Sequence, residues 1–148
     1  MTVQGKTLLV AVSRLSITQT RAAGTAAKVA GVNSTSYAIL SELSLDGWLK
    51  NGQIAERLGM STGGVTPALD RLERSGFVER SPNPADRRSS VVSITPDGQG
   101  VLREASELLA SELEGFIEEL DERDRETVLR FLVRANDAYE AVQESLDG

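Results

Sequence analysis

The stretch STGGVTPALDRLERSGFVER, Ser61 to Arg80, contains a good helix with a poor beginning. Three of its apolar residues fall at i, i+4 and i+7, which is the spacing of one buried helix face: Val65, Leu69 and Leu72. Two glycines and a proline stand in the first turns, although both residue types disfavour the interior of a helix. The stretch therefore predicts a helix whose beginning serves a purpose other than stability.

The residues before this helix predict a tight corner. A short helix holds Ile54, Ala55 and Leu58; the small Ala55 lets the next helix cross closely, and Gly59 supplies a left-handed turn. This order is that of a helix-turn-helix, whose second helix enters the major groove of DNA with its N-terminal residues at the base edges. Glycines at that end leave the helix free to approach the groove, and its unpaired N–H groups face phosphate.

Pro67 interrupts the hydrogen bonding of this second helix. It cannot donate to the carbonyl of Gly63, so we expect a bend or a short tight turn there. In an alternative interpretation, the glycines and the proline mark a loop, and the helix begins near Ala68.

Helices are predicted on both sides of the corner. A first helix spans about residues 6–30, and a second has cap residues at 33–34 and ends at the turn signal of residues 46–47. Near the C-terminus, Thr95 caps a helix that starts with Pro96, and a last helix spans about residues 124–146.

After Gly76 the apolar period changes to that of strands. Residues 77–80 and 91–95 predict two short strands joined by a long loop, 81–90, which contains Asp86, Arg87 and Arg88. An arginine on an extended arm can reach the narrow minor groove of DNA, and a neighbouring carboxylate can hold its guanidinium in place. The fold class is therefore mainly α with a small β-hairpin: a winged helix-turn-helix flanked by N- and C-terminal helices.

Composition narrows the function further. The chain has 148 residues, 40% apolar and 26% charged, which suits one globular domain. It has no cysteine and no histidine, so most catalytic and soft-metal sites are excluded, and we expect no enzyme, cofactor or metal. No apolar run approaches the roughly 18 residues of a membrane span, and residues 8–12 are too short a run for a signal peptide. We expect a cytoplasmic protein with no membrane partner.

The net charge of −6 is distributed unevenly along the chain. Residues 1–50 carry five basic and two acidic side chains, residues 51–96 six and five, and residues 97–148 five and fifteen. The acidity thus lies in the C-terminal third, where a solvated helical surface explains it. The corner and the hairpin are not repelled from phosphate by their own charge.

Two segments resemble a known family. GQIAERLGMSTGGVTPALDRLERSGFVER, Gly52 to Arg80, and NPADRRSSVVSITPDG, Asn83 to Gly98, are similar to the multiple antibiotic resistance regulator (MarR) family of bacterial transcription factors. The resemblance implies one protomer over residues 1–148. Its winged helix-turn-helix covers about residues 33–97, and its dimerisation helices cover about residues 5–31 and 98–146. It also implies a homodimer and a small-molecule pocket near the junction of the two parts.

The resemblance assigns DNA contacts residue by residue. The start of the recognition helix faces the groove through Ser61, Thr62, Gly63, Thr66 and Pro67, while Arg71 and Arg74 reach the DNA backbone. Arg88 enters the minor groove, Asp86 orients it, and Arg87 contacts phosphate. For Arg71 and Arg74 the alternative is ordinary helical pairing with Asp70 or Glu73.

The sequence departs from the family at two positions. Pro67 stands where the family often has a polar or basic side chain, so Thr66 and Pro67 can offer apolar contact to thymine methyls, and sequence preference can rest on DNA shape. Lys50 stands where serine or threonine usually caps the helix before the turn, and Asn51 can replace that cap.

The terminal helices carry apolar stripes at residues 8–32 and 128–142, more than a winged domain covers. A two-fold dimer explains them and implies an inverted-repeat DNA site; alternatively, the two helices pack on each other within one chain.

The absence of cysteine and histidine argues against peroxide and zinc sensing, leaving a small organic effector or none. Weak ligand-binding candidates are Arg14, Tyr37 and Trp48, although aromatic residues at helix corners are usually core.

The predicted function is a DNA-binding repressor, acting as a homodimer on an inverted-repeat operator in double-stranded DNA and released by a small organic ligand. The alternative is a winged-helix module for protein–protein interaction with little or no DNA binding, which the acidic C-terminal third and Pro67 would suit.

Overall fold

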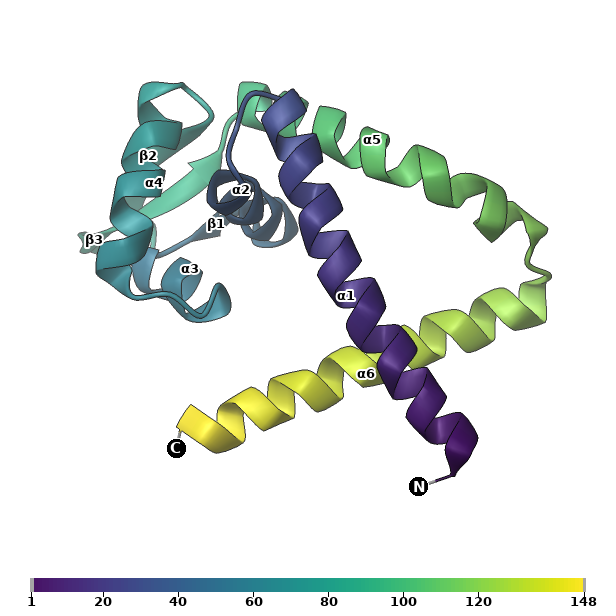
Figure 1. Cartoon of the computed structure of the whole chain (residues 1–148). Coiled ribbons are helices and arrows are strands. Elements are labelled where there is room, and N and C mark those ends of the chain that lie inside the picture. Colours follow the sequence, from purple (N-terminus) through teal and green to yellow (C-terminus); the bar gives the residue numbers. More distant parts are fainter. Residues whose placement is uncertain (1, 148) are drawn as a thin grey trace. The chain divides into compact units, whose positions relative to one another are not determined.

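The computed structural model describes residues 2–147. Its elements follow in the order α1 (Val3–Val29), α2 (Ser34–Asp46), β1 (Trp48–Leu49), α3 (Asn51–Arg57), α4 (Thr62–Arg74), β2 (Val78–Asn83), β3 (Asp86–Ile94), α5 (Pro96–Glu119) and α6 (Glu122–Asp147) (Figure 1). The chain divides into two compact units, residues 1–109 and residues 110–148. The first contains α1 to β3 with the first part of α5, and the second contains the end of α5 with α6.

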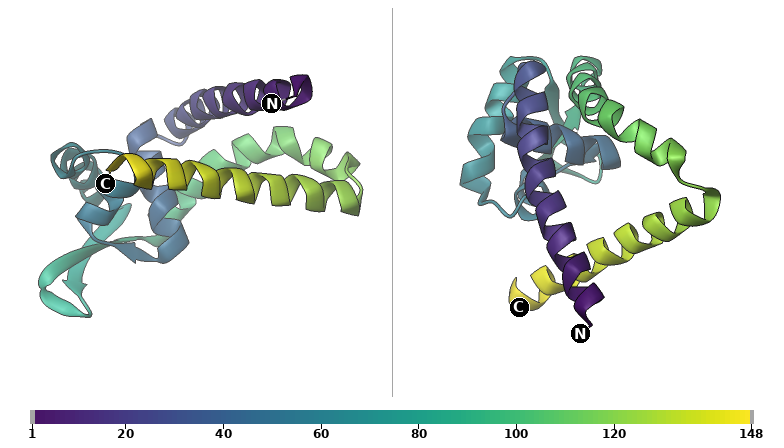
Figure 2. Two further views of the ribbon diagram at one scale, coloured as in Figure 1. Left: turned by 90° about the horizontal axis from the view of Figure 1, so that it is seen from below. Right: turned by 45° about the vertical axis from the view of Figure 1, so that its right-hand side comes forward.

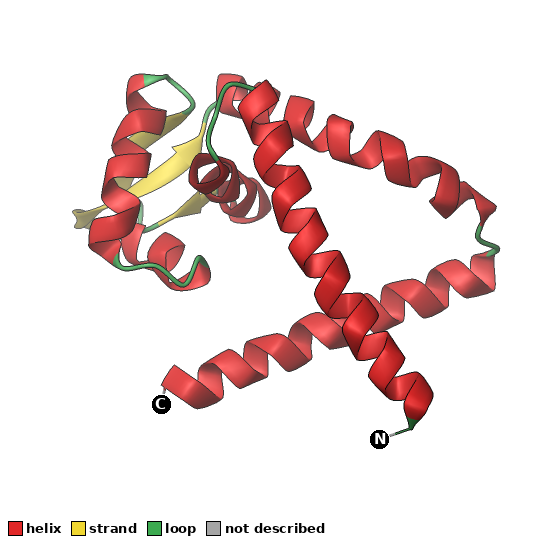
Figure 3. Ribbon diagram, in the orientation of Figure 1, coloured by secondary structure: helices red, strands yellow, loops and turns green. Residues whose placement is uncertain are grey.

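The strands form one antiparallel sheet in the order β1-β3-β2 (Figure 3). β2 and β3 pair from Val78 opposite Ile94 to Asn83 opposite Asp86, with a register shift between Pro82 and Asn83. The prediction of a long loop over residues 81–90 is therefore wrong, because both strands continue into it and only residues 84–85 turn. The outer part of the hairpin has no apolar face to bury, so its two strands can pair through polar residues. The sequence also gave no indication of the two-residue strand β1.

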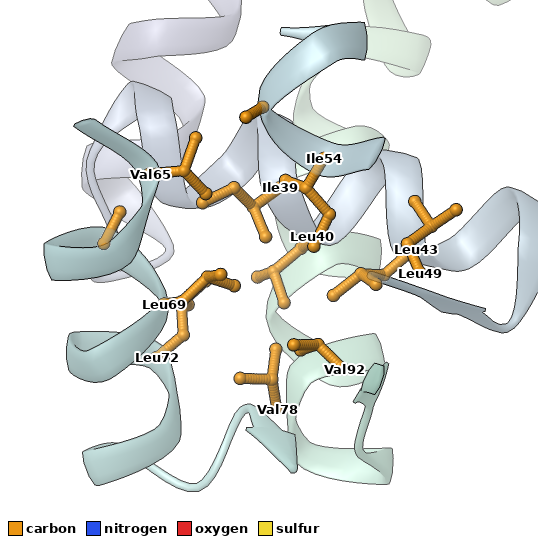
Figure 4. Close-up of a cluster of buried hydrophobic side chains, with 12 residues drawn as sticks. Ile39, Leu40, Leu43, Leu49, Ile54, Val65, Leu69, Leu72, Val78 and Val92 are labelled. Carbon is orange, nitrogen blue, oxygen red and sulfur yellow. The ribbon is translucent and has the colours of Figure 1, made fainter. Parts of the chain in front are cut away.

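The core of the first unit lies between α2, α3, α4 and the sheet (Figure 4). The predicted stripe of α4 is confirmed, since Val65, Leu69 and Leu72 are all buried. Each such side chain contributes about 1.5–3 kcal/mol when fully buried. They meet buried side chains of α2, α3 and the strands: Ile39, Leu40, Leu43, Leu49, Ile54, Val78 and Val92. One face of α4 is thus fixed to the core.

The helix caps follow the sequence in one case and not in another. Asn33 caps α2, and its side chain accepts a hydrogen bond from the N–H of Ser36 at 2.8 Å. The prediction that Asn51 caps α3 is wrong, because Asn51 is already helical and its Oδ1 is buried without a partner. Lys50 occupies the cap position, where its backbone N–H donates to Oε1 of Gln53 at 2.9 Å. Gln53 thus pairs the backbone N–H of Lys50, which is one half of a capping box, while Lys50 makes no side-chain cap hydrogen bond to the first turn of α3.

The start of α5 is joined closely to the turn after α4. Thr95 accepts a hydrogen bond from the N–H of Gly98 at 3.1 Å, and its hydroxyl donates to the carbonyl of Gly76 at 2.6 Å. A Cβ on Gly98 would lie 2.1 Å from the carbonyl oxygen of Phe77. Glycine is therefore required at residue 98 by the close passage of two backbones.

The second unit consists of the end of α5 and the helix α6, joined by a short turn, and it has an exposed apolar surface. Its turn is held by the Arg125 guanidinium, which donates to the carbonyls of Ile117 and Glu118 at 3.0 and 3.2 Å. None of the α6 side chains that the structure describes is buried. Large apolar side chains are exposed there and on α1, among them Leu8, Leu9, Leu15, Val128, Leu129, Leu132 and Tyr139. Within the described residues, every helix is too short or too polar to traverse a lipid bilayer.

Candidate DNA-binding surface

The corner between α3 and α4 has the predicted geometry. Gly59 adopts a φ of +60°, and the N–H of Met60 donates to the carbonyl of Ala55 at 2.8 Å. Ser61 caps α4, accepting a hydrogen bond from the N–H of Gly64 at 3.1 Å. The helix begins at Thr62, so the alternative of a loop up to Ala68 is wrong.

α4 continues without interruption through Pro67. The short tight turn expected there is therefore not found. Pro67 is exposed, while the next residue, Ala68, is buried. Packing of Ala68 and its neighbours holds the helix together although the proline cannot donate a backbone hydrogen bond.

The exposed start of α4 presents only small side chains. Ser61, Thr62, Gly63 and Pro67 are exposed, and Thr66 is half-buried. The hydroxyl of Thr66 donates to the carbonyl of Thr62 at 2.8 Å, so its donor is already engaged. A Cβ on Gly63 would meet nothing within 4 Å. Packing within the chain therefore gives no reason for a glycine at this position.

The arginines of α4 do not pair as the alternative proposed. Asp70 and Glu73 are both bound by Arg80 of β2, which sequence reasoning missed. Arg74 donates from Nε to the carbonyl of Asp70 at 3.1 Å. Arg71 is exposed and makes no ion pair with any described residue. Neither arginine of α4 thus has a carboxylate partner among the residues that the structure describes.

The wing brings Asp86 and Arg88 together at the start of β3. Oδ1 of Asp86 accepts a hydrogen bond from the backbone N–H of Arg88 at 3.1 Å and lies 3.6 Å from its Nε. The Arg88 side chain is 97% exposed. The backbone of Arg87 lies between them in β3, but its side chain is outside the described part of the structure. In the left view of Figure 2 the hairpin extends away from α2, α3 and α4.

A buried asparagine near the wing turn was also missed. Asn83 is 2% exposed; its Oδ1 accepts from the N–H of Ala85 at 2.9 Å and its Nδ2 donates to Oγ of Ser89 at 3.1 Å. Ser89 in turn donates to the carbonyl of Asp86 at 3.0 Å. These bonds link both strands of the wing to the residue that contacts Arg88. The Asn-Pro pair signals a turn, but nothing local predicts that Asn83 is buried.

The sequence model described as the MarR family matches residues 32–90, which contain α2 to α4 and most of the wing. HTH-type transcriptional regulator MhqR of Bacillus subtilis is 31% identical over 104 residues, which are 70% of this chain and 72% of MhqR. The chain belongs to the MarR family. It is therefore a DNA-binding transcriptional regulator of the helix-turn-helix type and not an enzyme.

Other proteins are similar to this chain in sequence or in fold. HTH-type transcriptional regulator YfiV of B. subtilis is 39% identical over 90 residues, 61% of this chain, and the chain spans only 56% of YfiV. A crystal structure of a MarR family transcription regulator superposes with a TM-score of 0.76 at 22% identity, covering 95% of this chain and 93% of that one. A mutant MarR from E. coli complexed with operator DNA gives a TM-score of 0.62 at 22% identity, covering 86% and 91%.

The three ligand-binding candidates of this MarR family chain, Arg14, Tyr37 and Trp48, lie on three different elements, α1, α2 and β1. Tyr37 packs against a cluster of small residues at the end of α1 and in α5, which contains Ala26, Ala30 and Ala105. Arg14 is exposed on α1, about 18 Å along the helix from Ala26 at 1.5 Å per residue. Trp48 is 43% exposed on the edge strand β1. The described residues include no group of acidic side chains that would hold a metal ion.

Proposed function

We propose that this MarR family protein is a homodimeric repressor whose binding to an inverted-repeat operator is relieved by a small organic ligand. The assignment of the DNA-binding surface rests on two features that occur together in the first unit. The start of α4 is exposed and carries only small side chains, and the wing presents Arg88 almost fully exposed beside Asp86. A recognition helix for the major groove and an arm for the minor groove have these properties.

The proposed contacts follow from these positions. The start of α4 approaches the base edges through Ser61, Thr62, Gly63, Thr66 and Pro67. Because no long side chain projects there, apolar contacts and DNA shape would carry much of the sequence preference. Arg71 and Arg74 contact phosphates of the DNA backbone. In the wing, Arg88 enters the minor groove, Asp86 fixes its direction, and Arg87 contacts phosphate.

The proposed dimer uses the terminal helices, about residues 5–31 and 98–146, and residues 33–97 bind DNA. On α6, Val128, Leu132 and Tyr139 stand at i, i+4 and i+11, which places them on one side of the helix, and they are 44%, 50% and 58% exposed. A second copy would cover such a stripe symmetrically. Two-fold symmetry then places two recognition helices on half-sites about one DNA turn apart. The complex of a mutant E. coli MarR with operator DNA supports DNA binding by a protein of this fold.

Repression and its relief follow from the same geometry. A dimer on an operator that overlaps a promoter competes with polymerase. A ligand that binds more tightly to a dimer with a different spacing of the α4 helices shifts the population away from the DNA-bound form.

The experiment is fluorescence anisotropy on duplexes that tile the DNA upstream of the protein's own gene, across a salt series. Wild type should prefer one duplex over random DNA and lose affinity steeply with salt, at about −0.9 in log–log slope per phosphate contact. Arg88→Ala should weaken binding and flatten the slope, whereas Arg103→Ala, on an exposed face of α5, should leave both unchanged. Absence of binding to these duplexes and to a pool of genomic fragments would overturn the proposal.

A further inference from the structure

Arg80 connects the wing to the recognition helix. It lies on β2, opposite Val92 of β3, and its guanidinium bridges two carboxylates of α4. Nη2 lies 2.8 Å from Oδ1 of Asp70, and Nη1 donates a hydrogen bond to Oε2 of Glu73. The Arg80 side chain is 27% exposed, so solvent screens the contact only partly. Two elements that the turn at residues 75–77 joins are thus also joined through their side chains.

The two carboxylates lie on the helix that approaches DNA. Asp70 and Glu73 are three residues apart and therefore lie on the same side of α4. Among the described residues, no other cation forms an ion pair with either of them. Residues 61–90 contain five basic and four acidic side chains, a net charge of +1, which falls to zero without Arg80. Arg80 therefore affects both the charge of this surface and its geometry.

We propose that Arg80 is a positioning residue for DNA binding, which fixes the wing relative to α4 without contacting DNA itself. The inference rests on the DNA contacts proposed above for α4 and Arg88. α4 must fit one groove while Arg88 reaches another, so a displaced wing would lose its contact when α4 is seated. The guanidinium that bridges Asp70 and Glu73 is directed at the helix and not at the outer surface.

Two variants with opposite changes in charge separate geometry from electrostatics. Arg80→Gln removes one positive charge, and Asp70→Asn combined with Glu73→Gln removes two negative charges. If net charge alone mattered, the first would weaken DNA binding and the second would strengthen it. A positioning role predicts that both weaken binding about tenfold or more, the scale of a lost charge-assisted hydrogen bond. The triple variant should bind no more weakly than the weaker of the two, because all of them break the same contact.

The measurement is anisotropy on the duplex that wild type binds most tightly, across a salt series. Adding Arg80→Gln to a protein that already carries Arg88→Ala should flatten the salt slope no further, since a residue that only positions the wing makes no phosphate contact of its own, which would be worth about 0.9 in slope. Arg103→Gln is the matched control for loss of one positive charge outside this surface. Circular dichroism melts verify folding. If Arg80→Gln does not fold, Arg80→Lys replaces it, because lysine keeps the charge but cannot bridge both carboxylates with a planar fork, and it should also bind less tightly than wild type.

Three results would overturn the inference while leaving the proposed function intact. These are tighter binding by the Asp70→Asn, Glu73→Gln variant, a further flattening of the slope when Arg80→Gln is added to Arg88→Ala, and wild-type affinity for the folded Arg80 variant. Failure of the wild-type protein to bind any duplex would instead contradict the proposed function itself, together with the inference.

Discussion

Replacing Gly98 with alanine tests the close passage of α5 over the turn that follows α4. The added Cβ would lie 2.1 Å from the carbonyl oxygen of Phe77 and 2.9 Å from Cγ1 of Ile94. Carbon–oxygen contacts in proteins are usually about 3.3 Å or longer, so one backbone must move by roughly 1 Å. The Phe77 carbonyl also accepts a hydrogen bond from the N–H of Thr95 at 3.0 Å, which limits that movement.

The expected cost can be estimated from these contacts. Overpacking costs about 1–3 kcal/mol, and weakening the hydrogen bond to Phe77 adds about 0.5–1.5 kcal/mol. Alanine recovers at most about 1 kcal/mol over glycine within a helix. The net loss in unfolding free energy is then about 1–3 kcal/mol. For a chain of this size it lowers the melting temperature by about 2–4 °C per kcal/mol.

Thermal melts followed by circular dichroism measure this effect, with all variants at one protein concentration because dimerisation shifts the melting temperature. Gly100→Ala is the matched control in the same helix, since a Cβ there meets only the end of the Arg103 side chain, at 3.9 Å. It should be neutral or slightly stabilising. A Gly98→Ala protein that melts with wild type, or with Gly100→Ala, would refute the reasoning.

Three further predictions concern the DNA-binding and dimer surfaces. Gly63→Ala should raise the free energy of unfolding by up to about 1 kcal/mol in urea titrations, because its Cβ meets nothing within the chain. The same methyl group should lower DNA affinity in anisotropy, and unchanged affinity would show that DNA does not approach this face. Asn83→Ala should weaken DNA binding by freeing the wing turn, while Ser90→Ala, with an exposed side chain, should not. Leu132→Glu should convert dimers to monomers in sedimentation velocity, whereas Arg134→Glu, on another side of α6, should leave the dimer intact.

Features that depend on near neighbours in the chain were predictable. The buried stripe of α4, the left-handed turn at Gly59 and the caps at Asn33 and Thr95 follow from periodicity and from the chemistry of single residues. The length of the wing was not. Pro82 and its polar neighbours indicate a loop, but β2 is an edge strand, where a proline is tolerated and no apolar alternation is needed.

Features that depend on partners distant in sequence were also missed. Helical spacing suggests that Asp70 and Glu73 pair with arginines of their own helix. In the structure both carboxylates form ion pairs with Arg80, which lies on β2 of the wing. Likewise, the burial of Asn83 depends on Ser89 across the hairpin. The site residues named from the resemblance lie on the expected elements, but their roles toward DNA stay predictions until binding is measured.

The two faces of α4 explain why its first turns contain glycines and a proline, which disfavour helix formation. The inner face holds Val65 and Leu69 in the core, so packing stabilises the helix and intrinsic propensity need not. The outer face is then free to carry residues that are poor for a helix, and Gly63 and Pro67 both lie exposed there. A Cβ at Gly63 would have open space, so alanine at that position would make the helix more stable. The glycine is therefore explained by a binding partner that approaches this face and not by packing within the chain. On this reasoning stability and DNA binding respond in opposite directions to the same added methyl group.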